Sequence, residues 1–180
     1  MPSSMNMKRA TGMPGSEFLE LSWEFFGELC RVLAVKVATS GYKPDLVIGI
    51  AKAGVIPGAV VASILRCDFY SLKISRDAGG DRTLSRPKIL SAAPKEAAGK
   101  TVLVVDEICT SGETMRLALN AVRQVSPAEV RTATSLIKTS GYRPDYYALE
   151  TSSTVAFPWD RHVLNADGEI ITNPIYADLV

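Results

Sequence analysis

The residue types best suited to chemistry lie in one stretch, TVLVVDEICTSGETM, which runs from Thr101 to Met115. An aliphatic run ends there at two adjacent acids, Asp106 and Glu107. A short turn rich in hydroxyl groups follows, which consists of Thr110, Ser111, Gly112, Glu113 and Thr114. Hydroxyls and free main-chain N–H groups bind a phosphate, and paired carboxylates bind sugar hydroxyls, either directly or through a divalent cation. The pattern therefore favours a site for a phosphorylated sugar.

Two elements must hold this turn in place. Residues 101–105 are too few for a buried helix and are rich in valine, which predicts a strand covered on both faces. Apolar residues return at helical spacing after Gly112, so we expect a helix to begin there. Open α/β sheets bind ligands at the carboxyl ends of their strands, and helix N-termini attract anions. A phosphate is therefore expected where this strand meets this helix.

A second strand, loop and helix repeat this plan nearer the N-terminus. The predicted buried strand 45–50 leads into a loop of three small residues and one lysine, namely Ala51, Lys52, Ala53 and Gly54. Small side chains let backbone amides approach an anion closely, and Lys52 adds a positive charge, so a second phosphate-type site is one interpretation. Tight packing of the turn is the other. The loop fits neither the P-loop pattern nor the G-x-G-x-x-G dinucleotide pattern.

The remaining periodic segments complete an α/β pattern. We expect a helix from Ser16, as its N-cap, to Ser40, stopped by Gly41. Alternation in the expected strand 128–140 brings Lys138 to its carboxyl end, where the side chain either faces a ligand or is solvated. Further strands are expected at residues 69–74, 145–149 and 154–157.

Residues 75–100 form a long segment without apolar periodicity. The segment contains glycines and prolines together with Arg76, Arg82 and Arg86. Long segments of this kind in a compact domain are usually mobile lids or disordered loops. A lid that carries arginines would shield a polyphosphate leaving group from water, and the alternative is a solvated surface loop.

The composition indicates a globular protein. Of the 180 residues, 47% are hydrophobic and 22% charged, so we expect a tail at residues 1–15 and a single domain at residues 16–180. A net charge of +1 gives no general attraction to nucleic acid or membranes. The three cysteines lack zinc-ligand spacing, and the sequence shows neither an apolar targeting segment nor a stretch long enough to span a membrane. These features favour the cytoplasm.

Four segments resemble, in order, those of the type I phosphoribosyltransferase family, and most closely its bacterial xanthine-guanine and hypoxanthine-guanine (6-oxopurine) members. VLVVDEICTSGET is similar to the family's signature for binding phosphoribosyl pyrophosphate (PRPP), and VIGIAKAGVIPGAVVASIL is similar to its pyrophosphate loop and the following helix. SLIKTSGYRPDYYALE resembles the lysine strand and the segment after it, and VAFPWD resembles the end of the hood that covers the base. The matches extend from about Asp45 to Asp160.

The resemblance implies both a fold and an activity. The implied fold is an α/β domain with a doubly wound, mainly parallel sheet, a flexible lid at about residues 75–100 and a small C-terminal hood at about residues 139–165. The implied activity is Mg²⁺-dependent transfer of the 5-phosphoribosyl group from PRPP to a ring nitrogen of a nucleobase, with a 6-oxopurine as the expected acceptor. The products are a nucleoside 5-monophosphate and pyrophosphate, as in nucleotide salvage. Homodimers or homotetramers are usual in the family, and neither nucleic acid nor a membrane is an expected partner.

The resemblance also implies a role for each matched residue. The turn formed by Thr110, Ser111, Gly112, Glu113 and Thr114 would bind the 5-phosphate. Asp106, Glu107 and Lys73 would be catalytic, and the metal ligands would be Asp106, Glu107 and Asp160. Pyrophosphate would be bound by Ala51, Lys52, Ala53, Gly54 and Arg76, with a backbone outlier expected at Ala51-Lys52. The base would be bound by Lys138, Phe157, Trp159 and Asp160.

Two positions depart from the pattern of the 6-oxopurine enzymes. Thr110 stands where those enzymes carry an aspartate that handles the purine proton, and threonine cannot act as a base at neutral pH. Thr154 stands near the usual base-stacking aromatic residue, for which Phe157 or Trp159 could substitute. The alternatives are a PRPP-binding regulator without turnover, a phosphoribosyltransferase for a different heterocycle, and a phosphoribosyl-group hydrolase or salvage enzyme for a non-nucleobase substrate. Cys109 is not expected to be a nucleophile, because no base accompanies it.

Overall fold

The computed structural model describes residues 18–77 and 83–179, and the side chains of residues 76, 77, 83–85 and 177–179 are outside the described part. The described chain forms two compact units. The larger, which we call the core unit, runs from Glu28 to Thr151. The smaller, which we call the small unit, combines the residues up to Gly27 with those from Ser152 onward. The predicted domain 16–180 thus comprises two units, and the predicted hood 139–165 has its last part, from Ser152, in the small unit.

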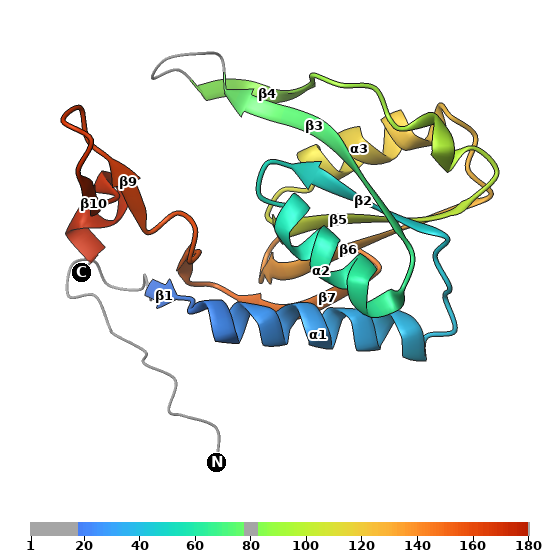
Figure 1. The fold of residues 1–180 in the computed structure, drawn as a ribbon, viewed down its shortest axis with the longest axis horizontal. Coiled ribbons are helices and arrows are strands. Elements are labelled where there is room, and N and C mark those ends of the chain that lie inside the picture. Colours follow the sequence, from blue (N-terminus) through green and yellow to red (C-terminus); the bar gives the residue numbers. More distant parts are fainter. Residues whose placement is uncertain (1–17, 78–82, 180) are drawn as a thin grey trace. The chain divides into compact units, whose positions relative to one another are not determined.

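The core unit is built on a six-stranded sheet in the order β4-β3-β2-β5-β6-β7 (Figure 1). Five of these strands are parallel, and β4 is antiparallel to β3, which confirms the predicted doubly wound, mainly parallel sheet. Continuous apolar runs produce the buried central strands, as expected for a sheet covered on both faces. The strands are β2 (Leu46–Ala51), β3 (Asp68–Asp77), β4 (Thr83–Ile89), β5 (Thr101–Cys109), β6 (Glu129–Lys138) and β7 (Tyr146–Thr151).

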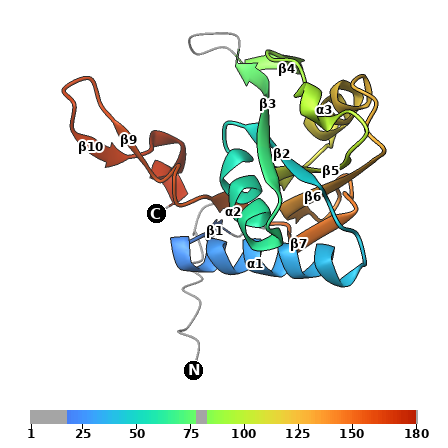
Figure 2. The same cartoon turned by 45° about the vertical axis from the view of Figure 1, so that its right-hand side comes forward.

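Helices cover both faces of this sheet: α1 (Trp23–Thr39), α2 (Val55–Leu65) and α3 (Glu113–Arg123). Alternate residues of β2 and β5 share one hydrophobic cluster with the buried side of α3; its members include Leu46, Ile48, Val102, Val104, Met115, Ala118 and Val122. On the opposite face α2 packs closely on β2, because a Cβ on Gly58 would lie 3.1 Å from the Gly49 Cα. In both views α2 and α3 lie on opposite sides of the strands (Figure 1, Figure 2).

The chain changes direction across the sheet between β2 and β5. From β2 it passes through α2 to β3 on one side, and from β5 through α3 to β6 on the other. The two helix connections therefore diverge at the carboxyl ends of these adjacent strands. Open α/β sheets bind ligands at such a switch point. The loops after β2 and β5 are the ones that the sequence predicts to bind phosphate groups.

The N-terminal helix starts later than the sequence predicts. It begins at Trp23, and the Ser22 hydroxyl accepts a hydrogen bond from the Phe25 N–H at 3.2 Å, so Ser22 caps the helix. Ser16, the predicted cap, lies outside the described residues. Residues Phe18–Glu20 instead form β1, which pairs in parallel with β8 (Thr154–Ala156). The predicted end is confirmed, because Gly41 adopts a positive φ of 81° just after the helix.

The small unit has little regular structure beyond two short strand pairings and one 3₁₀ segment. It contains the β1–β8 pair, an antiparallel hairpin of β9 (His162–Leu164) and β10 (Ile170–Thr172), and a terminal 3₁₀ segment, η2 (Pro174–Leu179). Phe18, Ala156 and Tyr176 form one buried cluster. Phe157 and Trp159 stack on each other with ring centroids 4.7 Å apart, and Phe26 contacts both rings edge-on.

Part of the predicted lid, residues 75–100, is strand rather than irregular chain. Strand β3 continues to Asp77 and pairs with β4 in an antiparallel ribbon, where backbone pairing needs no apolar periodicity. A short 3₁₀ turn, η1 (Lys95–Ala97), then buries Ala97. Residues 78–82, which include Arg82, lie outside the described residues. Among the residues described, no helix combines the length and apolar character needed to cross a membrane.

Candidate functional site

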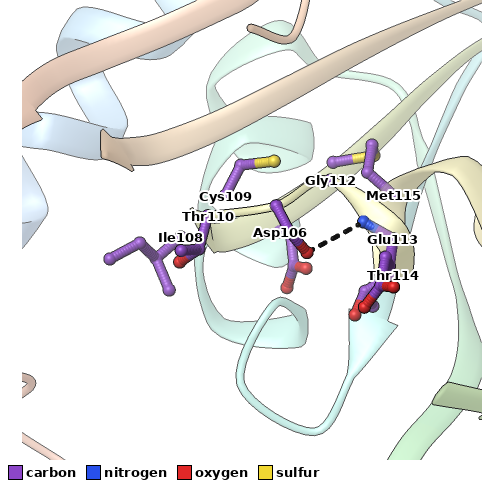
Figure 3. Close-up of a pocket in the computed structure, with 9 residues that line it drawn as sticks. Asp106, Ile108, Cys109, Thr110, Gly112, Glu113, Thr114 and Met115 are labelled. Atoms are coloured by element: carbon purple, nitrogen blue, oxygen red, sulfur yellow. Dashed lines mark hydrogen bonds between the residues drawn. The ribbon is translucent and has the colours of Figure 1, made fainter. Parts of the chain in front are cut away.

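A cavity of about 310 Å³ lies at the carboxyl end of β5 and the N-terminus of α3. Its lining comprises Asp106, Ile108, Cys109, Thr110, Ser111, Gly112, Glu113, Thr114 and Met115. Figure 3 shows the Asp106 carboxylate between Thr110 on one side and Glu113 and Thr114 on the other, with Ile108 pointing away. The structure therefore brings one predicted acid and all five predicted phosphate-binding residues together around one space.

The β5–α3 loop, residues 110–114, presents main-chain donors to this cavity. Within the described part of the chain, the N–H groups of Ser111 and Thr114 donate no hydrogen bond to another protein group, and the Gly112 N–H faces the Cys109 sulfur. The Glu113 N–H donates to the Ser111 hydroxyl over a long 3.4 Å, drawn as the dashed line in Figure 3. Gly112 precedes α3 with a φ of 79° and provides no side-chain cap. Unpaired N–H groups at the positive end of a helix dipole bind anions such as phosphate.

The two predicted acids lie together at the end of β5. Asp106 is buried, and the Glu107 N–H donates to its Oδ1 at 3.1 Å. Burial, followed by the neighbouring Glu107 carboxylate, raises the pKa of Asp106 well above its ordinary value. An ionised Asp106 is therefore unfavourable until hydroxyl donors or a cation compensate its charge. Asp106 and Glu107 are therefore suited to hold sugar hydroxyls or a divalent ion.

Cys109 is a core residue of this loop. Its side chain is 4% exposed, and burial, with a smaller effect of Asp106, raises the thiol pKa to about 11. The thiol is therefore protonated at neutral pH, when only the thiolate would be nucleophilic. This agrees with the sequence-based interpretation that Cys109 is not a nucleophile.

The loop after β2 lies directly beside the acids. Its Ala51-Lys52 peptide bond is cis, so the backbone outlier lies where the sequence led us to expect it. A Cβ added to Gly54 would lie 2.6 Å from Asp106 Oδ1, so only glycine fits between this loop and β5. Lys73 pairs in register with Ala51 on the adjacent strand β3, and Lys52 is exposed. Two lysines thus lie at this end of the sheet; Arg76 also belongs to β3, but its side chain is outside the described part.

The predicted base-binding residues divide between the two units. Lys138 is the last residue of β6 in the core unit, and its side chain is partly buried. Partial burial lowers the pKa of its ammonium group. Phe157, Trp159 and Asp160 belong to the small unit, where Phe157 is buried and stacked on Trp159.

The residues available for a metal ion are few. No cluster of three or more His, Cys, Asp and Glu side chains with metal-binding geometry occurs among the residues that the structure describes. Asp106 and Glu107 remain adjacent oxygen donors beside the cavity. Mg²⁺ is typically held by one or two carboxylates together with water and substrate phosphates, so a pair of acids fits this ion.

Two residues of the site are missing from the sequence-based list. Tyr142 follows Gly141 in the turn after β6, and its N–H donates to the Thr110 carbonyl at 2.9 Å. Arg116, in the first part of α3, donates through Nη1 to the Ser111 carbonyl at 3.1 Å. Both residues of this turn, Gly141 and Tyr142, lie in the quoted segment SLIKTSGYRPDYYALE, but no local signal shows that the turn meets the β5–α3 loop.

Comparison with known families matches most of the chain. The family model described as a phosphoribosyl transferase domain matches residues 21–165. Xanthine-guanine phosphoribosyltransferase of Gluconobacter oxydans is 27% identical over 148 residues, which are 79% of this chain and 84% of that protein. A solved purine phosphoribosyltransferase from Pyrococcus horikoshii has a TM-score of 0.69 and 27% identity, with 79% of this chain and 93% of that chain covered.

Other relatives match over shorter stretches. Phosphoribosyltransferase domain-containing protein 1 of Xenopus laevis is 34% identical over 91 residues, which are 48% of this chain and 39% of that protein. Hypoxanthine-guanine phosphoribosyltransferase of Mus musculus is 43% identical over 56 residues, which are 29% of this chain and 26% of that protein. The aligned parts thus span less than half the length of these two relatives.

Proposed function

Because the chain belongs to the phosphoribosyltransferase family, we propose that it transfers the 5-phosphoribosyl group of PRPP to a ring nitrogen of a nucleobase. The bond between C1 of ribose and the pyrophosphate oxygen breaks, a bond between C1 and the ring nitrogen forms, and the nitrogen loses its proton. The products are a nucleoside 5-monophosphate and pyrophosphate. The observation that carries this proposal is the pair of N–H groups at Ser111 and Thr114, which are unpaired within the described residues and lie beside the buried acid Asp106.

In this proposal the β5–α3 loop anchors the substrate by its 5-phosphate. Main-chain N–H groups donate to the phosphate oxygens, and the Thr110, Ser111 and Thr114 hydroxyls add further donors. Hydrogen bonds to a charged group contribute about 1.5–3 kcal/mol each, so three or four of them would anchor PRPP before the base makes any contact. Anchoring at a distance from the reacting carbon fixes the position of the ribose ring.

Asp106 and Glu107 are proposed to hold the 2- and 3-hydroxyls of the ribose and Mg²⁺. Hydroxyl protons or the cation compensate the buried Asp106 charge, which the apo protein disfavours. A bound Mg²⁺ supplies positive charge that stabilises the departing pyrophosphate. Asp160 of the small unit is proposed as a third metal ligand.

The β2–α2 loop and its neighbours are proposed to receive the leaving group. Residues 51–54 carry little side-chain bulk beside Asp106, so pyrophosphate can approach the backbone. Lys52, Lys73 and Arg76 supply positive charge as negative charge develops on the departing oxygen. The β3–β4 ribbon, which carries Arg76, is the proposed lid of the site.

The proposed acceptor is a 6-oxopurine, recognised by a hydrogen bond from Lys138 to its 6-oxo group, with contacts from Phe157, Trp159 and Asp160. A different heterocycle is the second proposed acceptor. Thr110 is the reason, because its hydroxyl cannot take the proton that the ring nitrogen of the base releases. A different heterocycle with a more acidic ring nitrogen would need no such base. We further propose that the protein acts in the cytoplasm as a homodimer or homotetramer; its three cysteines are all free, as in a reducing compartment.

The decisive experiment combines ligand binding with turnover. We expect Mg²⁺ with PRPP to raise the melting temperature of the protein, because a ligand that binds only the native state stabilises it. Incubation with PRPP, Mg²⁺ and a panel of purines and other heterocycles is expected to release pyrophosphate with hypoxanthine, guanine or xanthine. Turnover with another heterocycle alone would replace the 6-oxopurine assignment, and stabilisation without any turnover would indicate a PRPP-binding regulator. Absence of stabilisation by PRPP would refute the proposal.

Replacing Lys138 with methionine is expected to raise KM for the base about tenfold or more, because a hydrogen bond from a charged donor is lost. Binding of ribose 5-phosphate is expected to stay unchanged. The wild-type donor is the protonated ammonium, and burial lowers its pKa, so kcat/KM for the base is expected to fall on the alkaline side before an ordinary lysine would titrate. Steady-state kinetics across pH check both effects; an alkaline limb that persists in K138M would assign it to another group.

A further inference from the structure

The β5–α3 loop contains little that fixes its own shape. Gly112 offers no side chain to cap α3, and the hydrogen bond from the Glu113 N–H to the Ser111 hydroxyl is 3.4 Å long. Glycine at a positive φ also has more conformational freedom than any other residue. A phosphate site made of main-chain N–H groups requires those groups to point at one place. Contacts from outside the loop must therefore supply its rigidity.

The turn between β6 and β7 contacts the loop along its length. The Tyr142 N–H donates to the Thr110 carbonyl at 2.9 Å. The Tyr142 side chain lies so close to Gly112 that a Cβ on Gly112 would overlap it, and a Cβ on Gly141 would overlap the Thr110 carbonyl. The turn thus covers both the start of the loop, at Thr110, and its middle residue, Gly112.

Arg116 ties the same turn to α3. Its guanidinium lies 4.8 Å from the centroid of the Tyr142 ring, in cation–π geometry. Its Nη1 donates to the Ser111 carbonyl at 3.1 Å. The Arg116 N–H also donates to the Gly112 carbonyl at 2.8 Å, as the first helical bond of α3. Arg116 and Tyr142 therefore enclose Ser111 and Gly112 from two sides, and their hydrogen bonds to the loop go to its carbonyl oxygens.

We propose that Arg116 and Tyr142 are positioning residues, which clamp the β5–α3 loop in the conformation that binds the 5-phosphate. The proposal deepens the proposed function and rests on it for the identity of the ligand. The ring of Tyr142 is the essential part, because its hydroxyl makes no hydrogen bond within the described part of the chain. The clamp acts on the loop and not on the reacting atoms.

Tyr142→Ala tests the clamp against two matched variants. Tyr142→Phe keeps the ring, and Tyr147→Ala removes another tyrosine ring of the core unit, one that contacts Lys36 and Arg143 instead of the loop. Isothermal titration with ribose 5-phosphate is expected to give a Kd about tenfold higher for Y142A only. Steady-state kinetics are expected to show the same rise in KM for PRPP with kcat changed by less than about threefold, as for lost substrate positioning rather than lost chemistry.

A ligand-free measurement keeps the clamp testable by itself. In ¹⁵N relaxation of the apo proteins, order parameters of Ser111, Gly112 and Glu113 are expected to fall from about 0.85 to below about 0.6 in Y142A and to remain high in Y142F and Y147A. Equal order parameters in Y142A and wild type would overturn the clamp, as would equal Kd values for ribose 5-phosphate. Failure of the wild-type protein to bind ribose 5-phosphate would instead refute the proposed function, and the relaxation data would still decide the clamp.

Discussion

Gly112→Ala is expected to weaken binding of ribose 5-phosphate at least about 100-fold, because an alanine disfavours the loop conformation in which the N–H groups line the cavity. Two effects act at this position. A φ of 79° costs an alanine about 1–2 kcal/mol. The added Cβ would also overlap the Tyr142 side chain, so the loop and the turn after β6 must separate. Isothermal titration and the ligand-induced shift in melting temperature measure the loss.

Gly99→Ala provides the matched control. Gly99 also has a positive φ, of 69°, but a Cβ added there would meet nothing within 4 Å. Both variants are therefore expected to lose stability through backbone strain, and only G112A is expected to lose phosphate binding. If G112A and G99A bind ribose 5-phosphate equally well, the β5–α3 loop is not the phosphate site. Urea unfolding of both variants shows whether their losses of stability are comparable.

The sequence predicts the centre of the fold because its signals there are local. The central strands β2 and β5 are continuous apolar runs, and α3 begins immediately after a glycine whose positive φ marks the boundary. The strand β1 lacks such a signal. Phe18 and Leu21 have helical spacing with Phe25, so the pattern predicts one helix from Ser16, although residues 18–20 pair with β8 at the other end of the chain. Pairing between segments so far apart leaves no trace in local periodicity.

In the candidate site too, features encoded by consecutive residues could be predicted, and contacts between distant segments could not. The acids, the hydroxyl-rich turn and the small-residue loop are each readable from consecutive residues, and the structure brings them to adjacent strand ends. Tyr142 and Arg116 are not readable in this way, because their role depends on contact between a turn after β6 and a loop after β5. The glycines give a partial signal of such contacts, because Gly54 lies against Asp106 and Gly112 against Tyr142 at distances that leave no room for a side chain. The sequence shows the glycines, but only the structure identifies the residues that they contact.

Asp106→Asn is expected to lower kcat/KM for PRPP by about 10²- to 10³-fold, because it removes a carboxylate that is proposed to hold the ribose hydroxyls and Mg²⁺. The amide keeps the size of the side chain and can still accept the 3.1 Å hydrogen bond from the Glu107 N–H. Packing is therefore preserved, and the loss is one of charge. Pyrophosphate release with saturating base and varied PRPP measures it. Glu28→Gln, the same change at an exposed acid of α1, is expected to have no effect on turnover.

The same variant is expected to make the ligand-free protein more stable at neutral pH. Burial and Glu107 raise the pKa of Asp106 in the native state, so above the ordinary aspartate pKa of about 3.9 the unfolded chain binds fewer protons than the native chain. Wild-type stability therefore falls as pH rises through the interval between the two pKa values. D106N does not titrate, so its advantage in urea unfolding is expected at pH 7 and absent near pH 3.5. In the presence of Mg²⁺ and PRPP the wild type is expected to become the more stable of the two proteins, because only the wild type binds these ligands. If D106N is less stable than the wild type at pH 7 without ligands, the buried carboxylate is a structural group.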